Sequence, residues 1–584
     1  MLNNMKISSL PTLKPIEWLL GVLLLLAPFY FHPNIGGTGF RIPNNIVIWF
    51  FASVIGFYSL YKFSQAEYFY IPRYFLFIIA FPILAFFSGM SAGVEIANQW
   101  VFRLLYIWGG LLFFFGLYQH GLKQGRIDRI LFLIVISGLL HALVGLAQIV
   151  LVKNIPTWLP INPNGIPTGL FQQINNQASF QITSILTALW LSSRPYIKHG
   201  KSWRFWLILL SIGLGAFIVS YSGSRVAALA FIFALPLLLL SRWHQITIDK
   251  KRWWLIASII LISIFSSNIL NNSKHGNSGI TSVIEKTTAM NSGFSGSSRL
   301  GIYTIAYDAF KEQPIFGHGI GSFIRVWQLG KPQFYADHPN ANLPNQRVAH
   351  PHNETIFWLM EGGLVAGIGL LLFLIAILLT LKNLPPCRRY AYAALLLPIT
   401  LHTQVELPFY ISASHWFVFL IILFAIMHPY NHRRRVILSA AARMLIKVLV
   451  IFGGLSVAIF LSHTMASTLE FKDFILKKSS ADKSFPVSIQ NPYFKQLATE
   501  TMITSLFYAS AKHGLDDNVR AFAEWSEQEL KANPHILYYK LTVEALSYLQ
   551  KNKHACAITR EGLTIYPDDE ALQTIRGRCE EINL

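Results

Sequence analysis

The sequence is poor in charged residues. Asp, Glu, Lys and Arg make up 13% of its 584 residues, whereas soluble domains contain about 25%. Hydrophobic residues make up 53%, and apolar stretches recur from Ile16 to about His463, many of them near the roughly 20 residues that a membrane-spanning helix needs. The composition excludes an ordinary soluble protein and predicts an all-α polytopic membrane protein.

We expect about thirteen spanning helices. No small-residue cleavage site follows the first apolar run, so this run is predicted to remain as an anchor. The expected segments are 16–31, 45–61, 72–89, 99–118, 128–151, 176–193, 204–221, 225–241, 253–270, 361–381, 390–405, 413–428 and 444–463.

Positive charge is distributed unevenly between alternate loops. If the N-terminus is cytoplasmic, the cytoplasmic segments hold 23 Lys and Arg against three acids, while the short loops on the other side hold only Arg41, Lys153 and Arg225. Lys and Arg favour the cytoplasmic side, and an odd number of helices then exports the C-terminus. The net charge of +20 reflects this topology, so we expect no nucleic-acid partner.

The chain divides into four parts. The exported loop begins with a run that we expect to be flexible, and loops this long are usually functional. The tail holds 14 Lys and Arg and 16 Asp and Glu, as a soluble domain would. The parts are 1–270 with nine helices, 271–360 as a large loop, 361–463 with four helices, and 464–584 as the tail.

The tail is predicted to be a helical, tetratricopeptide-like domain. Its Asn-Pro pair at 533–534 and its Tyr-Pro pair at 566–567 lie 33 residues apart, close to the 34-residue period of such repeats. These stacks often present a concave face to peptides or partner proteins. Of only three cysteines, Cys556 and Cys579 lie in this exported tail, where a disulfide is permitted; the sequence leaves open whether they pair.

Polar side chains that the topology places at the outer face come from five distant segments. Singly, each has an ordinary explanation: amides bond neighbouring helices, a terminal arginine reaches the interface, and a histidine lies at the surface. Their convergence on one face favours a site. They are Gln173, Asn175, Arg225, Arg299, His350, His352, Glu361, His402, Glu406 and Tyr410.

The stretch "VAHPHNETIFWLMEGG" places two histidines before an apolar helix. They can be polar caps, metal ligands or an acid/base site. A helix over 353–381 would be about 43 Å long, longer than the bilayer core of about 30 Å, so we expect a break at Gly362 and Gly363. Asn353 suits the N-cap. His352 would then lie at the positive end of the helix, which favours a neutral base.

Glu361 is nine residues after His352, about half a turn out of phase, so we expect it to point away as a structural anchor. A metal is the weaker interpretation, because no HExxH or carboxylate-rich motif accompanies the histidines, and none is expected as a cofactor. No GxSxG or SxxK motif supports a serine nucleophile. Arginines near a base instead fit a diphosphate and an attacking hydroxyl, as in a polyprenyl-diphosphate-linked glycan.

The motifs "TGLFQQINNQA", "SGSRVA", "SSRLGIYTIAYDAFKEQPIFGHGIGSF", "AHPHNETIFWLMEGG" and "LHTQVELPFYISASHW" resemble those of the O-antigen ligase and polymerase superfamily, in the same order over residues 160–430. The bacterial protein O-oligosaccharyltransferase branch, the pilin-glycosylation ligases, is the most similar.

The resemblance implies a role for each matching residue. It makes His352 the catalytic histidine and assigns Arg225 and Arg299 to the donor diphosphate. Gln173 and Asn175 fall on a Gln-Pro-Asn motif whose proline is Ile174 here.

Tyr410 matches a tyrosine of the protein-glycosylating branch. We expect it to line the glycan or acceptor site together with Glu406, His350, Gln173 and Asn175.

The implied activity is transfer of a preassembled glycan from undecaprenyl diphosphate to Ser or Thr of periplasmic or pilin-like proteins, in a bacterial inner membrane, without a metal or nucleotide. Transfer to the lipid A core and O-antigen polymerisation are the alternatives. The tail favours a protein acceptor. A lipid-linked glycan transporter would show internal repeats, which the sequence lacks, and a binding scaffold leaves the Arg and His residues unexplained.

Overall fold

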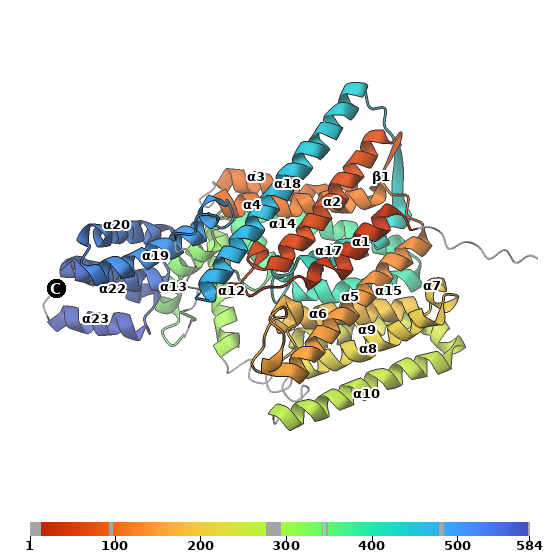
Figure 1. The fold of residues 1–584 in the computed structure, drawn as a ribbon, viewed down its shortest axis with the longest axis horizontal. Coiled ribbons are helices and arrows are strands. Elements are labelled where there is room, and N and C mark those ends of the chain that lie inside the picture. Colours follow the sequence, from red (N-terminus) through yellow and green to blue (C-terminus); the bar gives the residue numbers. More distant parts are fainter. Residues whose placement is uncertain are drawn as a thin grey trace, which may run out of the picture.

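A computed structural model describes residues 13–92, 97–275, 294–341, 343–345, 348–477 and 484–581. Most of the run expected to be flexible, 276–293, lies outside the described residues, as does Lys6 of the N-terminal segment. The described part is helical except for one two-stranded sheet (Figure 1). The prediction of an all-α polytopic membrane protein is confirmed, apart from this sheet.

Each of the thirteen expected spanning segments overlaps a helix, but the first, 16–31, is wrong in its end, because its α-helix stops at Leu25. Ten helices in the described part are long and apolar enough to cross a membrane, and α1, α6 and α15 are shorter or more polar than the other ten. The helices are α1 (Pro15–Leu25), α2 (Pro43–Gln65), α3 (Phe75–Ala92), α4 (Ala97–Tyr118), α5 (Gln124–Leu151), α6 (Ile174–Ser192), α8 (Ser202–Ser222), α9 (Arg225–Ile248), α10 (Lys250–His275), α14 (Glu354–Asn383), α15 (Pro386–His402), α17 (Ala413–Met427) and α18 (Ala440–Ile475).

Short elements join these helices. They are η1 (Ala27–Phe29), η2 (Gly39–Arg41), η3 (Val152–Asn154), η4 (Gly169–Phe171), α7 (Pro195–Lys198), α16 (Pro408–Ile411), η6 (His428–Tyr430) and η7 (Ser488–Gln490), with strands β1 (Tyr68–Pro72) and β2 (Asn431–Arg435).

Helix α6 lies at the centre of the bundle, against α5, α8, α9 and α15. Its buried amides bond to the backbone of α5: Gln177 Nε2 donates to the His141 carbonyl at 3.0 Å, and Gln181 Nε2 donates to the Gly138 carbonyl at 3.0 Å. The ordinary explanation of intramembrane amides therefore holds for Gln177, which is a bond between helices.

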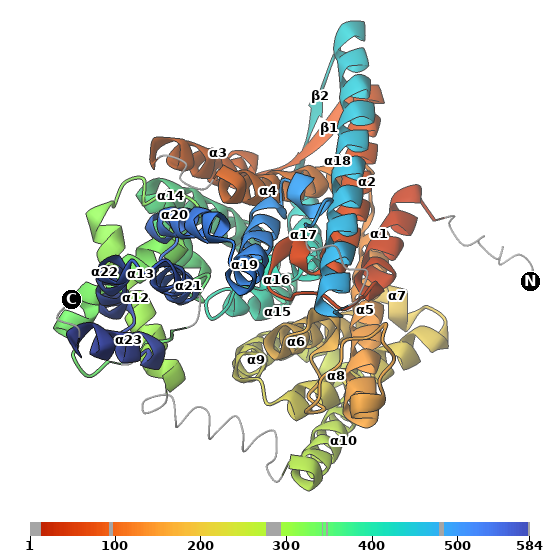
Figure 2. The same cartoon turned by 60° about the vertical axis from the view of Figure 1, so that its left-hand side comes forward.

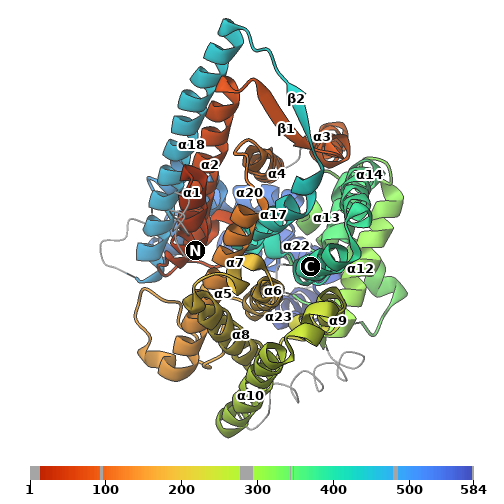
Figure 3. The same ribbon diagram turned by 90° about the vertical axis from the view of Figure 1, so that its right-hand side faces the viewer.

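Loops that the charge distribution assigns to one side do meet. Strands β1 and β2, from two predicted cytoplasmic loops, pair antiparallel (Figure 3). Lys14 Nζ donates to the His120 carbonyl at 2.6 Å, which joins two more such segments. On the other side, the Phe40 amide donates to Tyr493 Oη of the tail at 3.1 Å. These contacts agree with the predicted alternation of loops, which stays a prediction together with the compartment on each side.

The loop and the tail are both helical where described. The loop contains α12 (Phe294–Glu312) and α13 (Phe323–Asp337), and α13 lies beside the tail helix α22 (Figures 1 and 2). The tail helices are α19 (Lys495–His513), α20 (Asp516–Ala532), α21 (Ile536–Tyr548), α22 (Asn552–Ile565) and α23 (Glu570–Glu581).

The tail packs each helix on the next, as a helical repeat does. The two proline motifs occupy equivalent loops, after α20 and after α22, and Tyr566 Oη donates to the Pro534 carbonyl across them at 3.0 Å. Cys556 and Cys579 form a disulfide between α22 and α23.

The expected end of the last spanning helix at 463 is wrong. Helix α18 continues to Ile475 because Phe471 packs against Phe485 and Phe494 of the tail. The helix is therefore a continuous link between the membrane part and the tail.

Candidate active site

The predicted cap and break of α14 are both present. Asn353 Oδ1 accepts a hydrogen bond from the Ile356 amide at 3.0 Å, which makes it the N-cap. Helix α14 is interrupted at Gly363, whose φ of 59° and ψ of −162° are non-helical. A side chain at Gly363 would also collide with the Ile315 carbonyl. Gly362 lies directly before the break and keeps helical geometry, so Gly363 alone forms it.

Residues 314–319, which follow α12, satisfy the backbone groups that the break exposes. The Leu364 amide donates to the Pro314 carbonyl at 2.8 Å. The Gly319 amide donates to the Glu361 carbonyl at 2.9 Å. These bonds replace lost helical bonds and fix the first two turns of α14 against the loop.

His352 lies at the entrance to α14 and contacts a carboxylate from a distant part of the chain. Its Nδ1 is 2.8 Å from Glu406 Oε1. An ionised carboxylate only accepts hydrogen bonds, so Nδ1 carries the proton and Nε2 is left as the acceptor. His352 also has a φ of 55°, a strained backbone that functional sites often contain. The pair has the geometry of a general base and its orienting acid.

His350 contacts both members of this pair. Its Nδ1 accepts a hydrogen bond from the His352 amide at 3.3 Å, and its Nε2 is 3.8 Å from Glu406 Oε1. The His350 side chain is 14% exposed, against 31% for His352. The structure therefore separates two histidines that the sequence could not: His352 faces outward and His350 holds its backbone.

The charges of the cluster follow from burial and contact. Burial lowers the pKa of His350 to about 4, helped by neighbouring His352, so His350 is neutral near pH 7. Burial alone would raise the pKa of Glu406, but the hydrogen bond and charge of His352 hold it below its usual value. Glu406 is therefore an anion beside His352.

The amide region before α6 reaches the same cluster. Gln173 Nε2 donates to Glu406 Oε2 at 3.3 Å. Asn175 Oδ1 accepts a hydrogen bond from Ser224 Oγ at 2.9 Å, and Ser224 is the N-cap of α9, which begins at Arg225. One short segment thus connects the histidine cluster with the start of the arginine helix.

Arg299 approaches from α12. It lies one turn before Tyr303, whose pKa burial raises; the charge of Arg299 lowers that pKa and the charge of Glu406 raises it. The Tyr303 phenol is therefore within electrostatic reach of both groups. The donor-binding roles of the two arginines stay predictions.

Glu361 and Tyr410 belong to a second cluster around Arg103. Arg103 forms an ion pair with Glu361, and its guanidinium lies 5.5 Å from the Tyr410 ring. Glu361 Oε1 also accepts the Phe323 amide at 3.1 Å. These contacts agree with the expectation that Glu361 is a structural anchor. Tyr410 is placed with Arg103 and not at the His352–Glu406 pair.

Neither Arg103 nor Glu354 is among the candidate site residues predicted from the sequence. Arg103 is a lone cation in an apolar segment, "WVFRLLYIW", and such a residue is costly enough to indicate a function. Glu354 Oε1 accepts a hydrogen bond from Trp358 Nε1 at 2.9 Å, and its side chain also interacts with Tyr410. Its proximity to Tyr410 depends on a contact between segments that sequence spacing does not reveal.

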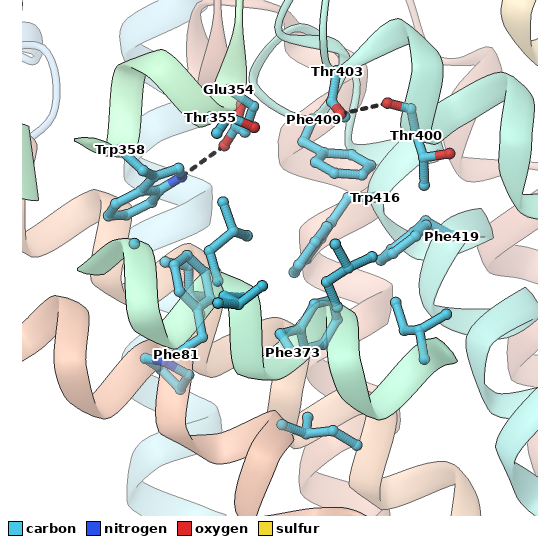
Figure 4. Close-up of a pocket in the computed structure, with 18 of the residues that line it drawn as sticks. Phe81, Glu354, Thr355, Trp358, Phe373, Thr400, Thr403, Phe409, Trp416 and Phe419 are labelled. Atoms are coloured by element: carbon cyan, nitrogen blue, oxygen red, sulfur yellow. Dashed lines mark hydrogen bonds between the residues drawn. The ribbon is translucent and has the colours of Figure 1, made fainter. Parts of the chain in front are cut away.

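An apolar cavity of about 510 Å³ lies below the first turn of α14. Glu354, Thr355 and Thr403 lie at one end, whereas Phe373 and Phe419 line the wall farther away (Figure 4). The Glu354 amide donates to the Thr403 carbonyl at 2.8 Å, so the polar end of the cavity is attached to the residues that follow His352.

His350, His352 and Glu406 also form a set of metal donors. Their ligand atoms all lie within 4.8 Å of one another, and two histidines with a glutamate are a known zinc-binding combination. The sequence argument against a metal relied on the lack of a nearby carboxylate, which Glu406 provides from 54 residues away. The expectation of a metal-free site therefore needs an experiment.

Two family models match the chain. One, described as O-antigen ligase, matches residues 206–374, which contain Arg225, Arg299 and His352. The other, described as the C-terminal part of a virulence factor membrane-bound polymerase, matches residues 390–577, which contain Glu406 and most of the tail. No curated protein matches the chain.

Proposed function

The chain belongs to the O-antigen ligase superfamily, and from this premise we propose that it is a protein O-oligosaccharyltransferase. The donor is a preassembled glycan on undecaprenyl diphosphate, and the acceptor is a Ser or Thr of a periplasmic or pilin-like protein. The acceptor hydroxyl loses its proton to His352 Nε2, its oxygen bonds to the anomeric carbon, and undecaprenyl diphosphate leaves.

The hydrogen bond between His352 Nδ1 and Glu406 Oε1, at 2.8 Å, carries this proposal. It sets the tautomer that exposes Nε2 as a base, and the Glu406 anion stabilises the imidazolium formed on proton transfer. A positioned general base contributes about 10²- to 10⁴-fold to rate. A structural histidine does not need both an outward-facing nitrogen and an orienting carboxylate.

The arginines support a diphosphate leaving group. Arg299 lies in α12 one turn before Tyr303, whose pKa responds to the charges of both Arg299 and Glu406. Arg225 begins α9, where the helix N-terminus adds backbone N–H groups that favour anions. Guanidinium groups bind diphosphate oxygens in pairs and offset the charge that develops on them as the sugar bond breaks.

The apolar cavity supports a lipid-linked donor in preference to a soluble sugar nucleotide. Its wall is made of helices α3, α4, α14 and α17, all of which are long and apolar enough to cross a membrane. An isoprenoid chain gains free energy from such a surface, at about 25 cal/mol per Å² buried, and a nucleotide does not.

A second candidate is a polymerase that joins lipid-linked glycans, because the model that matches the tail is described for a membrane-bound polymerase. Here the attacking hydroxyl would belong to a sugar of a second lipid-linked glycan. The base and the diphosphate-binding residues would be unchanged, so only the acceptor distinguishes the two reactions. Transfer to the lipid A core would likewise differ only in the acceptor.

We would test the function with purified protein in nanodiscs, a lipid-linked oligosaccharide and a pilin-like acceptor. Intact-mass spectrometry of the protein reports transfer, and electrophoresis of the lipid-linked glycan reports chain growth. A mass increase on Ser or Thr supports the proposed activity. Lengthened lipid-linked glycan with no change in the protein supports the polymerase, and modified lipid A–core supports the ligase.

Two sets of controls belong to this test. His352→Ala should abolish transfer, whereas His338→Ala, at an exposed histidine of the same loop, should not. Parallel reactions with EDTA, and with Zn²⁺ added back, decide the metal question. Activity that EDTA removes and Zn²⁺ restores would overturn the metal-free mechanism and make His350, His352 and Glu406 ligands.

A further inference from the structure

A buried lysine lies where helix α13, in the loop between α10 and α14, meets the tail. Lys331, in α13, is 0% exposed. Its Nζ lies 5.0 Å from the centroid of the Trp327 ring in α13, and 4.6 Å from that of the Tyr566 ring in the tail. Among the described residues no carboxylate pairs with it. A lysine buried in this way is costly, so an offsetting role is expected.

The lysine donates a hydrogen bond that bears on the active site. Its Nζ is 3.1 Å from the Pro344 carbonyl. Pro344 lies in the chain segment that connects α13 to His350 and His352, and the described residues of that segment form no helix or strand. The described part of this segment is held by this hydrogen bond together with the burial of Leu343 among the side chains of α12, α13 and α14.

Further contacts attach α13 to both neighbours. On the tail side, Arg325 Nε donates to the Lys531 carbonyl at 3.2 Å. On the membrane side, the Phe323 amide donates to Glu361 Oε1 at 3.1 Å, and the Phe323 ring meets the Phe357 ring edge-on at 5.8 Å. Helix α13 therefore contacts both the tail and the first turns of α14, so a displaced tail would displace α13 relative to α14.

The tail holds its side of this joint rigidly. Tyr566 is 0% exposed, and its Oη donates to the Pro534 carbonyl at 3.0 Å. The Cys556–Cys579 disulfide joins the two helices on either side of the Tyr566 loop. The Tyr566 ring beside the Lys331 amine is thus held by its burial, by its hydroxyl hydrogen bond and by the nearby disulfide.

We propose that Lys331 is a positioning residue for His352, and that the tail completes the active site by holding Lys331 against Tyr566. The tail then holds the segment that carries His350 and His352 in position, in addition to any contact with an acceptor. The expected effect on turnover rests on the proposed function. The expectation that Lys331 and Tyr566 hold the segment before His352 does not.

The test compares four variants of the full-length protein in nanodiscs. Lys331→Met keeps an unbranched chain and removes the donor, and Lys311→Met is the matched control at an exposed lysine of the same loop. Tyr566→Leu removes the ring, whereas Tyr566→Phe keeps it and loses only the hydroxyl bond. If Lys331→Met fails to fold, the two Tyr566 variants decide.

Lys331→Met and Tyr566→Leu should each lower kcat by about 10- to 100-fold, because small displacements of a catalytic group cost this much, with KM for the donor unchanged. The double variant should lose no more than the worse single variant. Tyr566→Phe and Lys311→Met should remain within about twofold of wild type. Because a loss of folded protein would also lower the apparent kcat at constant KM, kcat is calculated per folded protein in each variant.

Hydrogen exchange of the protein without substrate measures the joint independently. The peptide that contains His350 and His352 should exchange faster in Lys331→Met and Tyr566→Leu than in wild type. Unchanged exchange together with kcat within twofold of wild type would overturn the proposal. If wild type transfers glycan to no acceptor, the proposed function fails, and the exchange data still decide whether Lys331 positions the segment.

Discussion

Replacing Glu406 with glutamine tests the general base most directly. The amide keeps the size of the carboxylate, and its oxygen can still meet Gln173 Nε2, now 3.3 Å from Glu406 Oε2. It loses the charge, however, and its NH₂ can donate to His352 Nδ1. That donation moves the imidazole proton to Nε2, the atom that must accept the proton of the acceptor hydroxyl.

The magnitude follows from the roles that the carboxylate has in the structure. A hydrogen bond to a charged group contributes about 1.5–3 kcal/mol, and loss of the correct tautomer removes most of a base effect of about 10²- to 10⁴-fold. The base effect alone corresponds to about 3–5 kcal/mol of activation free energy. We expect Glu406→Gln to lower kcat by about 10²- to 10⁴-fold and to leave the donor KM within about threefold.

The assay is initial-rate transfer to a fluorescent acceptor peptide, separated by chromatography, over a range of donor concentrations. Glu406→Asp, shorter by one methylene, should lie between wild type and Glu406→Gln. Glu312→Gln is the matched control, because that glutamate is on the same face of the membrane and its side chain is 72% exposed. A Glu406→Gln enzyme within threefold of wild-type kcat would refute the dyad.

Four more outcomes are expected. Arg299→Ala should lower kcat/KM by about 100-fold or more, as loss of an anion-stabilising donor does; normal turnover would remove the diphosphate-binding role. Gly363→Ala should cost at least about 2 kcal/mol in unfolding free energy, from a positive φ and a backbone collision, whereas Gly21→Ala, with nothing within 4 Å of the new Cβ, should be neutral or stabilising in thermal unfolding. Cys556→Ser should cost the tail about 3 kcal/mol, estimated from the length of the closed loop, and a reductant should lower the Tm of wild type but not of the variant. Burial lowers the pKa of Lys331 from 10.5 to about 7, so between these pH values the unfolded chain binds a proton that the folded chain does not. The stability of wild type should therefore rise from pH 7 towards about pH 9 relative to Lys331→Met. Parallel profiles of Tm against pH for the two proteins would contradict this.

The positions of the helices along the chain were predictable because they depend on local composition. Each of the thirteen apolar runs contains a helix, and even the break in α14 followed from length and glycine placement. The N-cap of Asn353 was likewise predictable, since a cap bond reaches only three residues along the chain. The end of α18 was not, because Phe471 meets partners in a separate part of the tail.

The candidate site was predictable as a set of residues and not as an arrangement. The sequence alone placed His352, Glu406, Arg225 and Arg299 on one face, through the alternation of loops. It did not reveal that Glu406 lies 2.8 Å from His352 Nδ1 or that Tyr410 lies beside Arg103. The assignment of both residues to a glycan or acceptor site stays a prediction.

The difference has one physical cause. Hydropathy, charge asymmetry and capping act within one helix or across one membrane passage, so the sequence by itself determined the spans, their alternation and the broken helix. Hydrogen bonds and ion pairs act over about 3 Å, and the pairs that define this site join residues far apart in the chain, as Gln173 with Glu406 or Lys331 with Tyr566. Only the tertiary structure decided which polar groups meet, because that depends on how the helices pack.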